Sequence, residues 1–217
     1  MNAPLLLELF TEELPPKALQ ALGIAFGEHI LTVLSQYQLS QRDPTRMRVF
    51  ASPRRLGVML EGVMEESAER SESRKLMPAN VGFDAAGAPT TALRKKLEKE
   101  GHNLDGIERK FEGDAEFVFL NHRIPGVALE VGVQAALLHA VSRLPIPKIM
   151  EYQLADGTTT VKFVRPVHGL IALHGNKVLN VSVLGLNASR IAHGHRFQGA
   201  KDISLEQAGQ YEAKMRD

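Results

Sequence analysis

The sequence predicts an α+β fold in which a mixed or antiparallel sheet packs against helices. Short segments with apolar residues in continuous or alternating runs predict strands in both halves of the chain. Two longer segments, at about residues 16–38 and 126–144, carry apolar residues at mostly helical spacing. The dipeptide Gly175-Asn176 separates two predicted strands by the length of a hairpin turn, which favours antiparallel neighbours.

The first predicted elements are a strand and a long helix. Residues 4–10 (PLLLELF) form an apolar run typical of a buried strand. The paired prolines Pro15-Pro16 suit a first helical turn, because proline lacks the N–H that would be unpaired there. The helix is expected to end near Gln38. We interpret Glu12-Glu13 as acids favoured by the positive end of this helix dipole, rather than as a pair for acid–base chemistry.

The next segments predict strands and polar connections. Residues 46–63 are expected to form two strands joined at Ser52-Pro53, because Arg46 and Arg48 alternate with apolar residues. Residues 65–75 lack an apolar stripe and predict a loop or an exposed helical turn.

The middle of the chain predicts one short helix and one strand. Residues 80–89 are rich in turn formers. Thr90 or Thr91 is expected to cap a short helix that Gly101 ends. Residues 115–123 predict another strand. Taken together, these segments favour an N-terminal α+β region over residues 1–200, with a subdivision near 65–125.

The second half predicts a helix, three strands and a final helix. The helix at 126–144 is expected to end at Pro145. Strands are expected at 158–164, 169–174 and 177–184. The Ser204-Leu205-Glu206-Gln207 segment matches a capping box, so residues 201–217 are interpreted as the start of a helix that leads into a downstream domain.

Composition excludes several classes of protein. The 217 residues include 26 Lys+Arg and 25 Asp+Glu, giving a net charge of +1, which excludes a globally basic nucleic-acid arm and an acidic tail. The chain contains no cysteine, so disulfides, thiolate zinc sites and a catalytic Cys are excluded. The N-terminal segment lacks the basic region of a signal peptide. No uncharged apolar run approaches 18 residues, so no membrane span is expected.

Charge is nevertheless unevenly distributed along the chain. Residues 157–201 contain no Asp or Glu, yet they hold six Lys or Arg and four His residues. If these side chains share one face, they form a patch that attracts phosphates. The alternative is that strand periodicity scatters them over both faces and that they pair with acids from elsewhere.

Seven basic side chains are candidates for phosphate or RNA contacts. Arginine suits this role because its planar guanidinium recognises phosphate with two hydrogen bonds. For several of these residues a structural role is as plausible, because arginine at a bend also holds backbone carbonyls or pairs with acids. The candidates are Arg54, Arg55, Arg165, Arg190, His195, Arg196 and Lys201.

The sequence contains no autonomous set of catalytic residues. The His193-Gly194-His195 pattern resembles a metal-binding pair, but no carboxylate lies within the acid-free stretch to complete the coordination shell. The Gly-rich phosphate loops GxGxxG and GxxxxGK[ST] are absent, as is the GxSxG nucleophile motif. We therefore predict neither a catalytic nor a metal site in this chain.

Six sequence blocks, in the same order, resemble one family across about residues 5–215. The first follows Leu7-Glu8 and reads TEELPPKAL from Thr11. The others are SPRRL from Ser52, GFD with GAPT from Gly82, LPIPK from Leu144, FVRPVH with ALHG from Phe163, and GHRF from Gly194. These motifs resemble those of the bacterial glycyl-tRNA synthetase beta subunit.

Three positions depart from the family pattern. Phe10 stands where the family usually has glycine, and Gly169 stands where an aromatic residue is common. The segment Leu93-Arg94-Lys95-Lys96 replaces an expected Gly-Phe-Ala. The aromatic contact at position 169 is therefore not expected in this chain.

The resemblance implies a function that the residues alone do not. Members of the family form an α2β2 heterotetramer that uses ATP with Mg to attach glycine to tRNA-Gly in the cytoplasm. The alpha subunit carries out the adenylate chemistry, so no cofactor is expected on this chain. The beta subunit supplies surfaces for tRNA binding and assembly, and its N-terminal region is similar to the editing-like domain of the phenylalanyl-tRNA synthetase large subunit. The alternatives are a purely structural module without RNA contact and a His-based metal hydrolase.

Overall fold

The computed structural model describes residues 2–146, 148–154, 156–194 and 202–216. The chain divides into two compact units. The first consists of Met1–Ser67 and Val127–Asp217, and the second of Ala68–Gly126. The fold is α+β with antiparallel strand pairing, as the sequence predicts.

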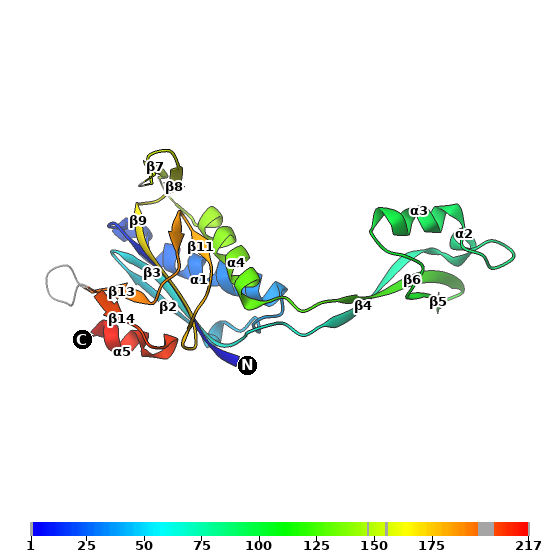
Figure 1. Cartoon of the computed structure of the whole chain (residues 1–217), viewed down its shortest axis with the longest axis horizontal. Coiled ribbons are helices and arrows are strands. Elements are labelled where there is room, and N and C mark those ends of the chain that lie inside the picture. Colours follow the sequence, from blue (N-terminus) through cyan, green and yellow to red (C-terminus); the bar gives the residue numbers. More distant parts are fainter. Residues whose placement is uncertain (1, 147, 155, 195–201, 217) are drawn as a thin grey trace. The chain divides into compact units, whose positions relative to one another are not determined.

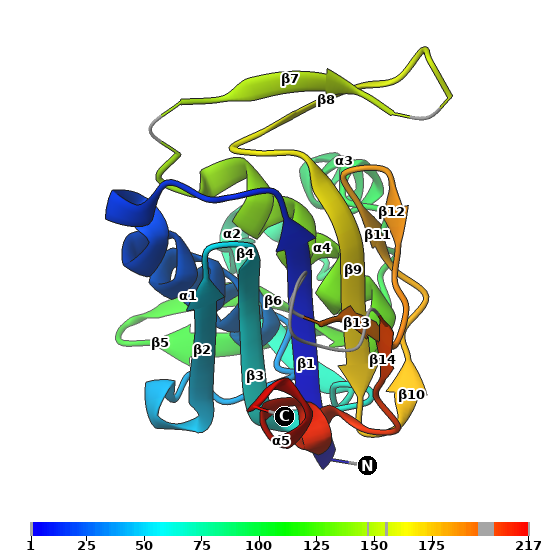
Figure 2. The same ribbon diagram turned by 90° about the vertical axis from the view of Figure 1, so that its left-hand side faces the viewer.

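A five-stranded sheet with the order β10-β9-β1-β3-β2 organises the first unit. The strands are β1 (Asn2–Thr11), β2 (Met47–Ser52), β3 (Arg55–Met64), β9 (Val167–His174) and β10 (Lys177–Val178). All neighbouring strands are antiparallel. The N-terminal strand therefore lies in the middle of the sheet, which explains its apolar run (Figure 2).

Two long helices cover one face of this sheet. A short 3-10 turn at Pro16–Ala18 leads into α1 (Leu19–Gln36), and α4 (Leu129–Arg143) packs beside it (Figure 2). Both helices were predicted. The segment Pro16–Gln36 is long and apolar enough to cross a membrane by length and composition alone. However, its buried residues belong to the same core cluster as the sheet, as in the core helix of a globular domain.

The opposite face of the sheet carries a smaller apolar layer. The hairpin of β13 (Ile191–His193) and β14 (Asp202–Ser204) lies over it, followed by a 3-10 turn and α5 (Tyr211–Arg216) (Figure 2). A helix does form near Arg216 as predicted, but it begins only at Tyr211, and the predicted cap at Ser204 is wrong. Ser204 ends β14, where it pairs with Ile191 across the hairpin, so its backbone is extended rather than helical.

Short hairpins complete the first unit. Strands β7 (Met150–Gln153) and β8 (Thr160–Phe163) form one pair, and β11 (Ser182–Val183) and β12 (Leu186–Asn187) form another. The predicted turn at Gly175-Asn176 joins β9 to β10. The single strand predicted at 177–184 is divided into β10 and β11, and β7 was not predicted.

The second unit is a three-stranded sheet with helices on one face. Strands β4 (Arg70–Pro78), β6 (Ala115–Ile124) and β5 (Ile107–Glu112) lie in the order β4-β6-β5 (Figure 1). Helices α2 (Ala79–Gly82) and α3 (Thr91–Lys99) supply its apolar core.

The outcome of the predictions for this unit is mixed. The Thr90 side chain caps α3, as predicted, by accepting a hydrogen bond from the Leu93 N–H at 3.3 Å. The prediction of a loop or helical turn at 65–75 agrees with residues 65–69, which lie outside the strands, but is wrong from Arg70, where β4 begins. Residues 70–75 of this strand are exposed and are held by backbone hydrogen bonds to β6. Because they bury no side chains, the sequence shows no apolar alternation there.

Candidate functional site

Alternation along β1 sends different residues to the two faces of the sheet. Leu5, Leu7 and Leu9 enter the core beneath α1 and α4. Leu6 belongs to the cluster on the opposite face, and Glu8 and Phe10 follow it at the same period. The candidate site therefore lies on the α5 side, where the strand changes from apolar to polar and aromatic residues.

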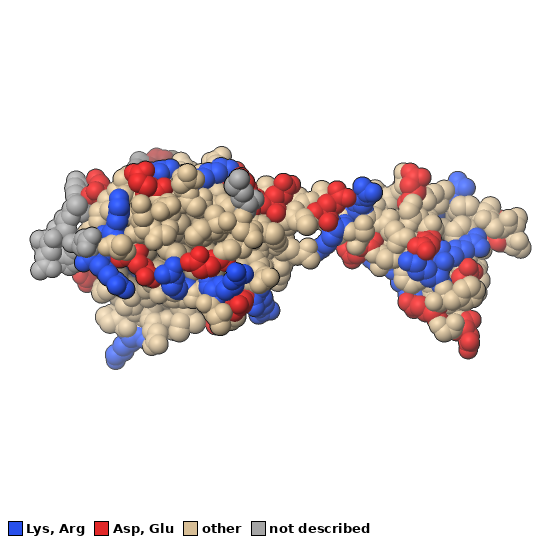
Figure 3. Space-filling view, turned by 90° about the horizontal axis from the view of Figure 1, so that it is seen from below, with Lys and Arg blue, Asp and Glu red and all other residues tan. Residues whose placement is uncertain are grey.

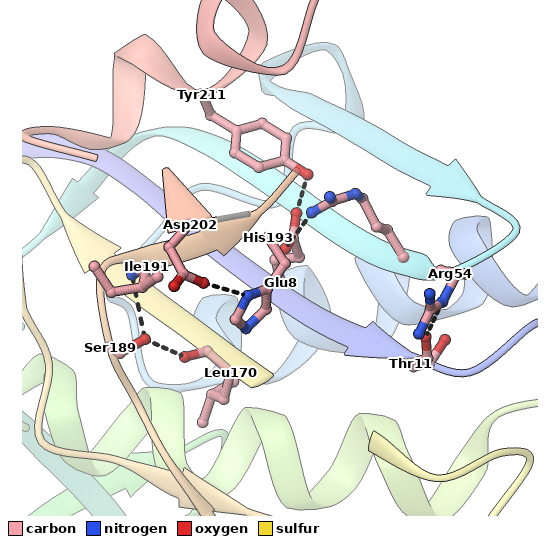
Figure 4. Close-up of polar contacts among 10 residues, drawn as sticks. Glu8, Thr11, Arg54, Leu170, Ser189, Ile191, His193, Asp202 and Tyr211 are labelled. Atoms are coloured by element: carbon pink, nitrogen blue, oxygen red, sulfur yellow. Dashed lines mark hydrogen bonds and ion pairs between the residues drawn. The ribbon is translucent and has the colours of Figure 1, made fainter. Parts of the chain in front are cut away.

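A buried ion pair forms the base of this site. The Glu8 side chain is only 1% exposed, and its carboxylate accepts a hydrogen bond from the Arg55 guanidinium at 2.9 Å. The Tyr211 hydroxyl, from α5, also donates to Glu8 (Figure 4). Burial raises the pKa of the Glu8 carboxyl, although the Arg55 charge and the Tyr211 hydrogen bond act in the opposite direction. Burial and the adjacent carboxylate also raise the pKa of Tyr211.

Basic side chains surround the ring of Phe10 on the same face. Phe10 pairs with Arg55 on β3 and with Gly169 on β9. The guanidinium carbons of Arg54 and Arg55 lie 4.9 and 5.3 Å from the ring centroid, within cation–π distance. The His193 ring centroid lies 4.8 Å from it. The aromatic ring thus gathers basic side chains from two segments, the β2–β3 connection with the start of β3, and β13.

A bulge in β9 brings His168 to the edge of this cluster. The register shifts between Phe10 and Thr11, so His168 is the extra residue between the paired positions of β9. Its Nε2 lies 2.8 Å from a Glu12 carboxylate oxygen. The same Glu12 oxygen accepts from Arg54 at 3.4 Å, and Arg54 also donates to the Thr11 carbonyl (Figure 4).

These contacts correct the interpretation of Glu12-Glu13. The first turns of the 3-10 segment and of α1 contain no acidic residue, because the helical backbone begins only at Pro16. Glu12 instead holds Arg54 and His168 together. Glu12 therefore acts through side-chain pairing and not through the helix dipole.

His193 is oriented by a carboxylate. Its Nδ1 lies 2.9 Å from the Asp202 carboxylate across the β13–β14 hairpin (Figure 4). Its other nitrogen, Nε2, lies near Gly169. Among the residues that the structure describes, no group of three His, Asp or Glu side chains is arranged to hold a metal ion.

Two other candidate arginines donate to backbone carbonyls. Arg165 donates to the carbonyls of Glu13 and Val164, both at 2.9 Å. Arg190 donates to the carbonyls of Asn176 at 3.1 Å and Leu205 at 3.4 Å. Apart from the bond between Arg165 and its neighbour Val164, these bonds join separate segments of the chain, which matches the structural alternative considered for such arginines.

An open pocket of about 630 Å³ lies at the end of β1. Glu12, Glu13 and Arg165 line it together with several prolines. Its wall contains charges of both signs. It is therefore not a cationic cleft. It lies beside the side chains of Arg54, Arg55, His168 and His193 around Phe10, which we call the Phe10 cluster.

The structure brings together some of the seven candidates. Arg54 and Arg55 meet at Phe10, whereas Arg165 and Arg190 contact other segments. His195, Arg196 and Lys201 lie outside the described residues. On the face of the molecule shown in Figure 3, Lys and Arg side chains lie among Asp and Glu side chains instead of forming one separate patch.

Sequence reasoning missed three residues of the cluster. Phe10 was noted only as a departure from the family pattern, and Tyr211 was not singled out. Glu8 carried a usable signal, because a carboxylate inside an apolar strand must find a partner when it is buried. The identity of that partner depends on β1 lying beside β3, which no local pattern reveals.

Comparison with known proteins assigns the chain to a family. Residues 5–217 match the family model of the glycyl-tRNA synthetase beta subunit. The chain is 48% identical to the glycine–tRNA ligase beta subunit of Delftia acidovorans over 223 aligned positions, which cover all of this chain and 32% of the relative.

Two further relatives carry the same name. The Janthinobacterium protein is 49% identical and covers 95% of this chain, and the Thiobacillus denitrificans protein is 47% identical and covers 97%. This chain spans only 30% of the length of either protein. The agreement between the family model and these relatives shows that the chain belongs to the glycyl-tRNA synthetase beta subunit family.

Proposed function

We propose that this chain forms part of a glycine–tRNA ligase, the enzyme that attaches glycine to tRNA-Gly at the expense of ATP. The observation that carries the proposal is the family match over residues 5–217, together with relatives that are nearly half identical along the whole chain. Those relatives are named beta subunits. The protein therefore works in a complex with a second kind of subunit, which we propose to be an α2β2 heterotetramer in the cytoplasm.

The proposed contribution of this region is assembly and tRNA positioning rather than adenylate chemistry. The sequence contains none of the phosphate-binding loops that would hold ATP. In the holoenzyme, ATP and its Mg ion are proposed to act through the alpha subunit. Within this chain, polar side chains such as Glu8, Arg55 and Tyr211 hold segments of the fold together.

The contacts of the described arginines favour assembly as the main role. Arg55 is paired with a buried carboxylate, and Arg165 and Arg190 donate to backbone carbonyls. An arginine that must release such a partner before it binds phosphate loses part of the binding energy. A module whose arginines are engaged in this way is better suited to presenting a folded surface than to neutralising phosphates.

A tRNA contact at the Phe10 cluster is the second candidate. Arg54 makes a long ion pair with the exposed Glu12 and a 3.2 Å hydrogen bond to the Thr11 carbonyl, and His168 is exposed at the edge of the same cluster. Phosphate contacts at this position would orient tRNA without reading its sequence, since charge alone carries no sequence information. The candidates His195, Arg196 and Lys201 remain part of this proposal.

Aminoacylation tests the main proposal. The complete beta subunit, mixed with the alpha subunit of the same organism, should attach radiolabelled glycine to tRNA-Gly, and either subunit alone should not. Replacement of tRNA-Gly by another tRNA is the specificity control. Absence of glycine transfer by the mixed subunits would contradict the proposal.

The salt dependence of binding tests the tRNA contact. Each phosphate neutralised in a duplex contributes about −0.9 to the slope of log K against log salt concentration. In the Arg54→Gln variant the slope should become less negative by about one unit, whereas Arg190→Gln should leave it unchanged. An identical slope in the wild type and Arg54→Gln would place the tRNA contacts elsewhere. Elemental analysis of the purified protein tests the metal-hydrolase alternative, which requires bound metal.

A further inference from the structure

The second unit is neutral as a whole, but its ion pairs are unevenly distributed. Residues 68–126 hold ten Lys or Arg and ten Asp or Glu. The bases that form ion pairs are Arg74, Lys75, Lys110 and Arg123. Residues 83–99 hold four further bases, none of which pairs with an acid in the described part of the chain, and only two acids. Positive charge is therefore in excess on α3 and the loop before it.

Two arginines are held at the loop that precedes α3. The loop begins at Phe83 and ends at Pro89, and these two residues form an isolated antiparallel bridge. Arg94, on α3, donates a long hydrogen bond of 3.4 Å to the Pro89 carbonyl. The guanidinium carbon of Arg109, on β5, lies 3.8 Å from the centroid of the Phe83 ring, within cation–π distance. Because Phe83 and Pro89 are bridged, both guanidinium groups are anchored at the same end of this loop.

An exposed aromatic ring lies on the same side of the sheet. Alternation along β5 places Ile107, Arg109 and Phe111 on one face. That face is the one covered by the helices, because Ile107 packs against the core that α3 supplies. Phe111 continues the row beyond Arg109, and its side chain is 74% exposed. We call Phe83, Arg94, Arg109 and Phe111 the Arg109 site.

Three acids near the Arg109 site leave its arginines without a carboxylate partner. Asp84 follows Phe83 in the loop, but its Oδ1 accepts hydrogen bonds from two backbone N–H groups of the same loop, at 2.9 and 2.8 Å. Glu98 follows Arg94 by one helical turn, and Glu116 is the cross-strand partner of Phe111. Among the residues that the structure describes, none of these acids forms an ion pair with Arg94 or Arg109.

The chemistry of the Arg109 site suits single-stranded nucleic acid. Proteins bind such strands by stacking bases on aromatic rings and guanidinium planes while basic groups contact the phosphates. A nucleotide would use both the charges and the ring, because it carries a phosphate and a planar base. The site differs in this respect from Arg165 and Arg190 of the first unit, which donate to backbone carbonyls. Arg109 instead stacks on a ring, which leaves its N–H groups available to a ligand.

We propose that the Arg109 site binds an unpaired stretch of the tRNA, with Arg94 and Arg109 on phosphates and Phe111 stacked on a base. The inference rests on the proposed function, since the names of the relatives supply tRNA as the nucleic acid. Arg94 lies in the segment that departs from the family pattern, so the site is a feature of this chain and not of the shared motifs. Every base has a face that can stack, so the contact positions the strand without reading its sequence.

The charges are tested by the salt dependence of tRNA-Gly binding to the complete beta subunit. Each phosphate contact on a single strand contributes about −0.7 to the slope of log K against log salt concentration. In Arg94→Gln/Arg109→Gln the slope should therefore become less negative by about 1.4. The matched control is Lys75→Gln/Lys110→Gln, which removes two charges from the opposite face of the same sheet. Both lysines are paired with acids there, so the slope should not change.

The ring is tested separately, because stacking depends little on salt. Phe111→Ser should weaken tRNA-Gly binding about tenfold and leave the slope unchanged. The control is Leu104→Ser, which removes another exposed apolar side chain of the second unit and should leave the affinity unchanged. Thermal unfolding of each complete subunit should show that all four variants fold.

Three outcomes would overturn the inference. The first is an unchanged affinity and slope in the folded arginine variant. The second is weaker association with the alpha subunit while tRNA binding stays the same, which would make the site a protein interface. The third is a lower melting temperature of the complete arginine variant with unchanged tRNA binding, which would show that other parts of the beta subunit cover the site. Glycine transfer by the wild-type subunits tests the proposed function separately, so its absence would not be mistaken for failure of this site.

Discussion

The two faces of the five-stranded sheet are built from the same strands but are stabilised by different interactions. Beneath α1 and α4, the face contributes side chains such as Leu7 and Leu9, with no polar partner among them. On the α5 side, the face begins with Leu6 and then continues into Glu8 and Phe10. The first face depends on packing volume, and the second depends on individual pairs of charges and rings.

The difference matters because the two kinds of interaction respond differently to substitution. Burial of apolar area is non-directional, so a core tolerates changes that keep its volume. A buried ion pair is specific, since removal of one partner leaves the other charge desolvated. The loss of unfolding free energy should therefore be largest for substitutions that remove a charge on the α5 side. It should be smaller for substitutions that change packing volume on the helical side.

The largest effect is expected for Arg55→Met, which leaves the Glu8 carboxylate buried without its counter-charge. Loss of one partner from a buried pair costs about 3–5 kcal/mol. Urea unfolding at pH 7 should measure this loss. The control is Arg48→Met, because Arg48 forms exposed pairs with Glu61 and Glu212 whose loss costs at most about 1 kcal/mol.

The pH dependence of the same variant has a definite sign. Burial raises the pKa of Glu8 in the folded protein above its ordinary value of 4.5. A carboxyl with a raised folded-state pKa favours the fold most below its unfolded pKa, and this contribution is lost as the pH rises through the folded pKa. Removal of Arg55 raises the folded pKa further. The loss of unfolding free energy in Arg55→Met, relative to the wild type, should therefore shrink as the pH falls from 7 towards 5. A loss that stays constant with pH would show that Glu8 is not its cause.

A smaller loss is expected for Tyr211→Phe, which removes the hydroxyl that donates to Glu8. A hydrogen bond to a charged group contributes about 1.5–3 kcal/mol. The loss should appear in urea unfolding and in faster amide exchange of α5, which Tyr211 anchors. Tyr152→Phe is the matched control, since its hydroxyl accepts only one long bond, at 3.4 Å, from the Val167 N–H. Equal losses for the two variants would contradict a special role for Tyr211.

On the helical face, Gly23→Ala tests packing volume. A β-carbon at Gly23 would lie 2.7 Å from the Ala51 β-carbon, which has no flexible side chain that could move away. Overpacking costs about 1–3 kcal/mol, and the better helix propensity of alanine returns about 1 kcal/mol. The net expectation is a loss of about 1 kcal/mol in the unfolding free energy. Gly209→Ala, on the α5 side, has open space and should cause no loss.

The sequence predicted the helical face better than the α5 face for a physical reason. Apolar periodicity identified β1, α1 and α4, because each must bury one side and the pattern repeats within the element. The α5 face depends on Glu8, Arg55 and Tyr211, which are distant in the sequence and meet only through strand order. The apolar periodicity of a single helix or strand does not indicate which residues of other elements it contacts. Strand β4 was missed for the opposite reason, since its exposed residues have no side to bury.

The candidate site was predicted in part for the same reason. The SPRRL segment correctly indicated a turn with two arginines, since a hairpin of β2 and β3 carries Arg54 and Arg55. The role of Arg55 could not be predicted, because it depends on a carboxylate 47 positions earlier in the chain. The RNA-binding role of the seven candidates stays a prediction.

The subtlest test of the α5 face concerns two positions that depart from the family pattern. Phe10 replaces a usual glycine, Gly169 replaces a common aromatic residue, and the two are direct partners across β1 and β9. A ring on either strand would therefore lie in the same cross-strand pair. A β-carbon at Gly169 would lie in ordinary contact 3.4 Å from His193 and 3.5 Å from the Phe10 β-carbon, so a ring at position 169 would pack directly against both.

A double-mutant cycle measures this compensation. Phe10→Gly removes the ring that gathers Arg54, Arg55 and His193, and Gly169→Trp adds a second ring beside it. Each single variant should be destabilised, whereas the double variant should regain about 1 kcal/mol relative to the sum of the two, because one ring again fills one site. Additive losses would mean that the two positions do not share a packing site. In that case the Phe10 cluster would be held by its charges alone, and the α5 face would depend on ion pairs throughout.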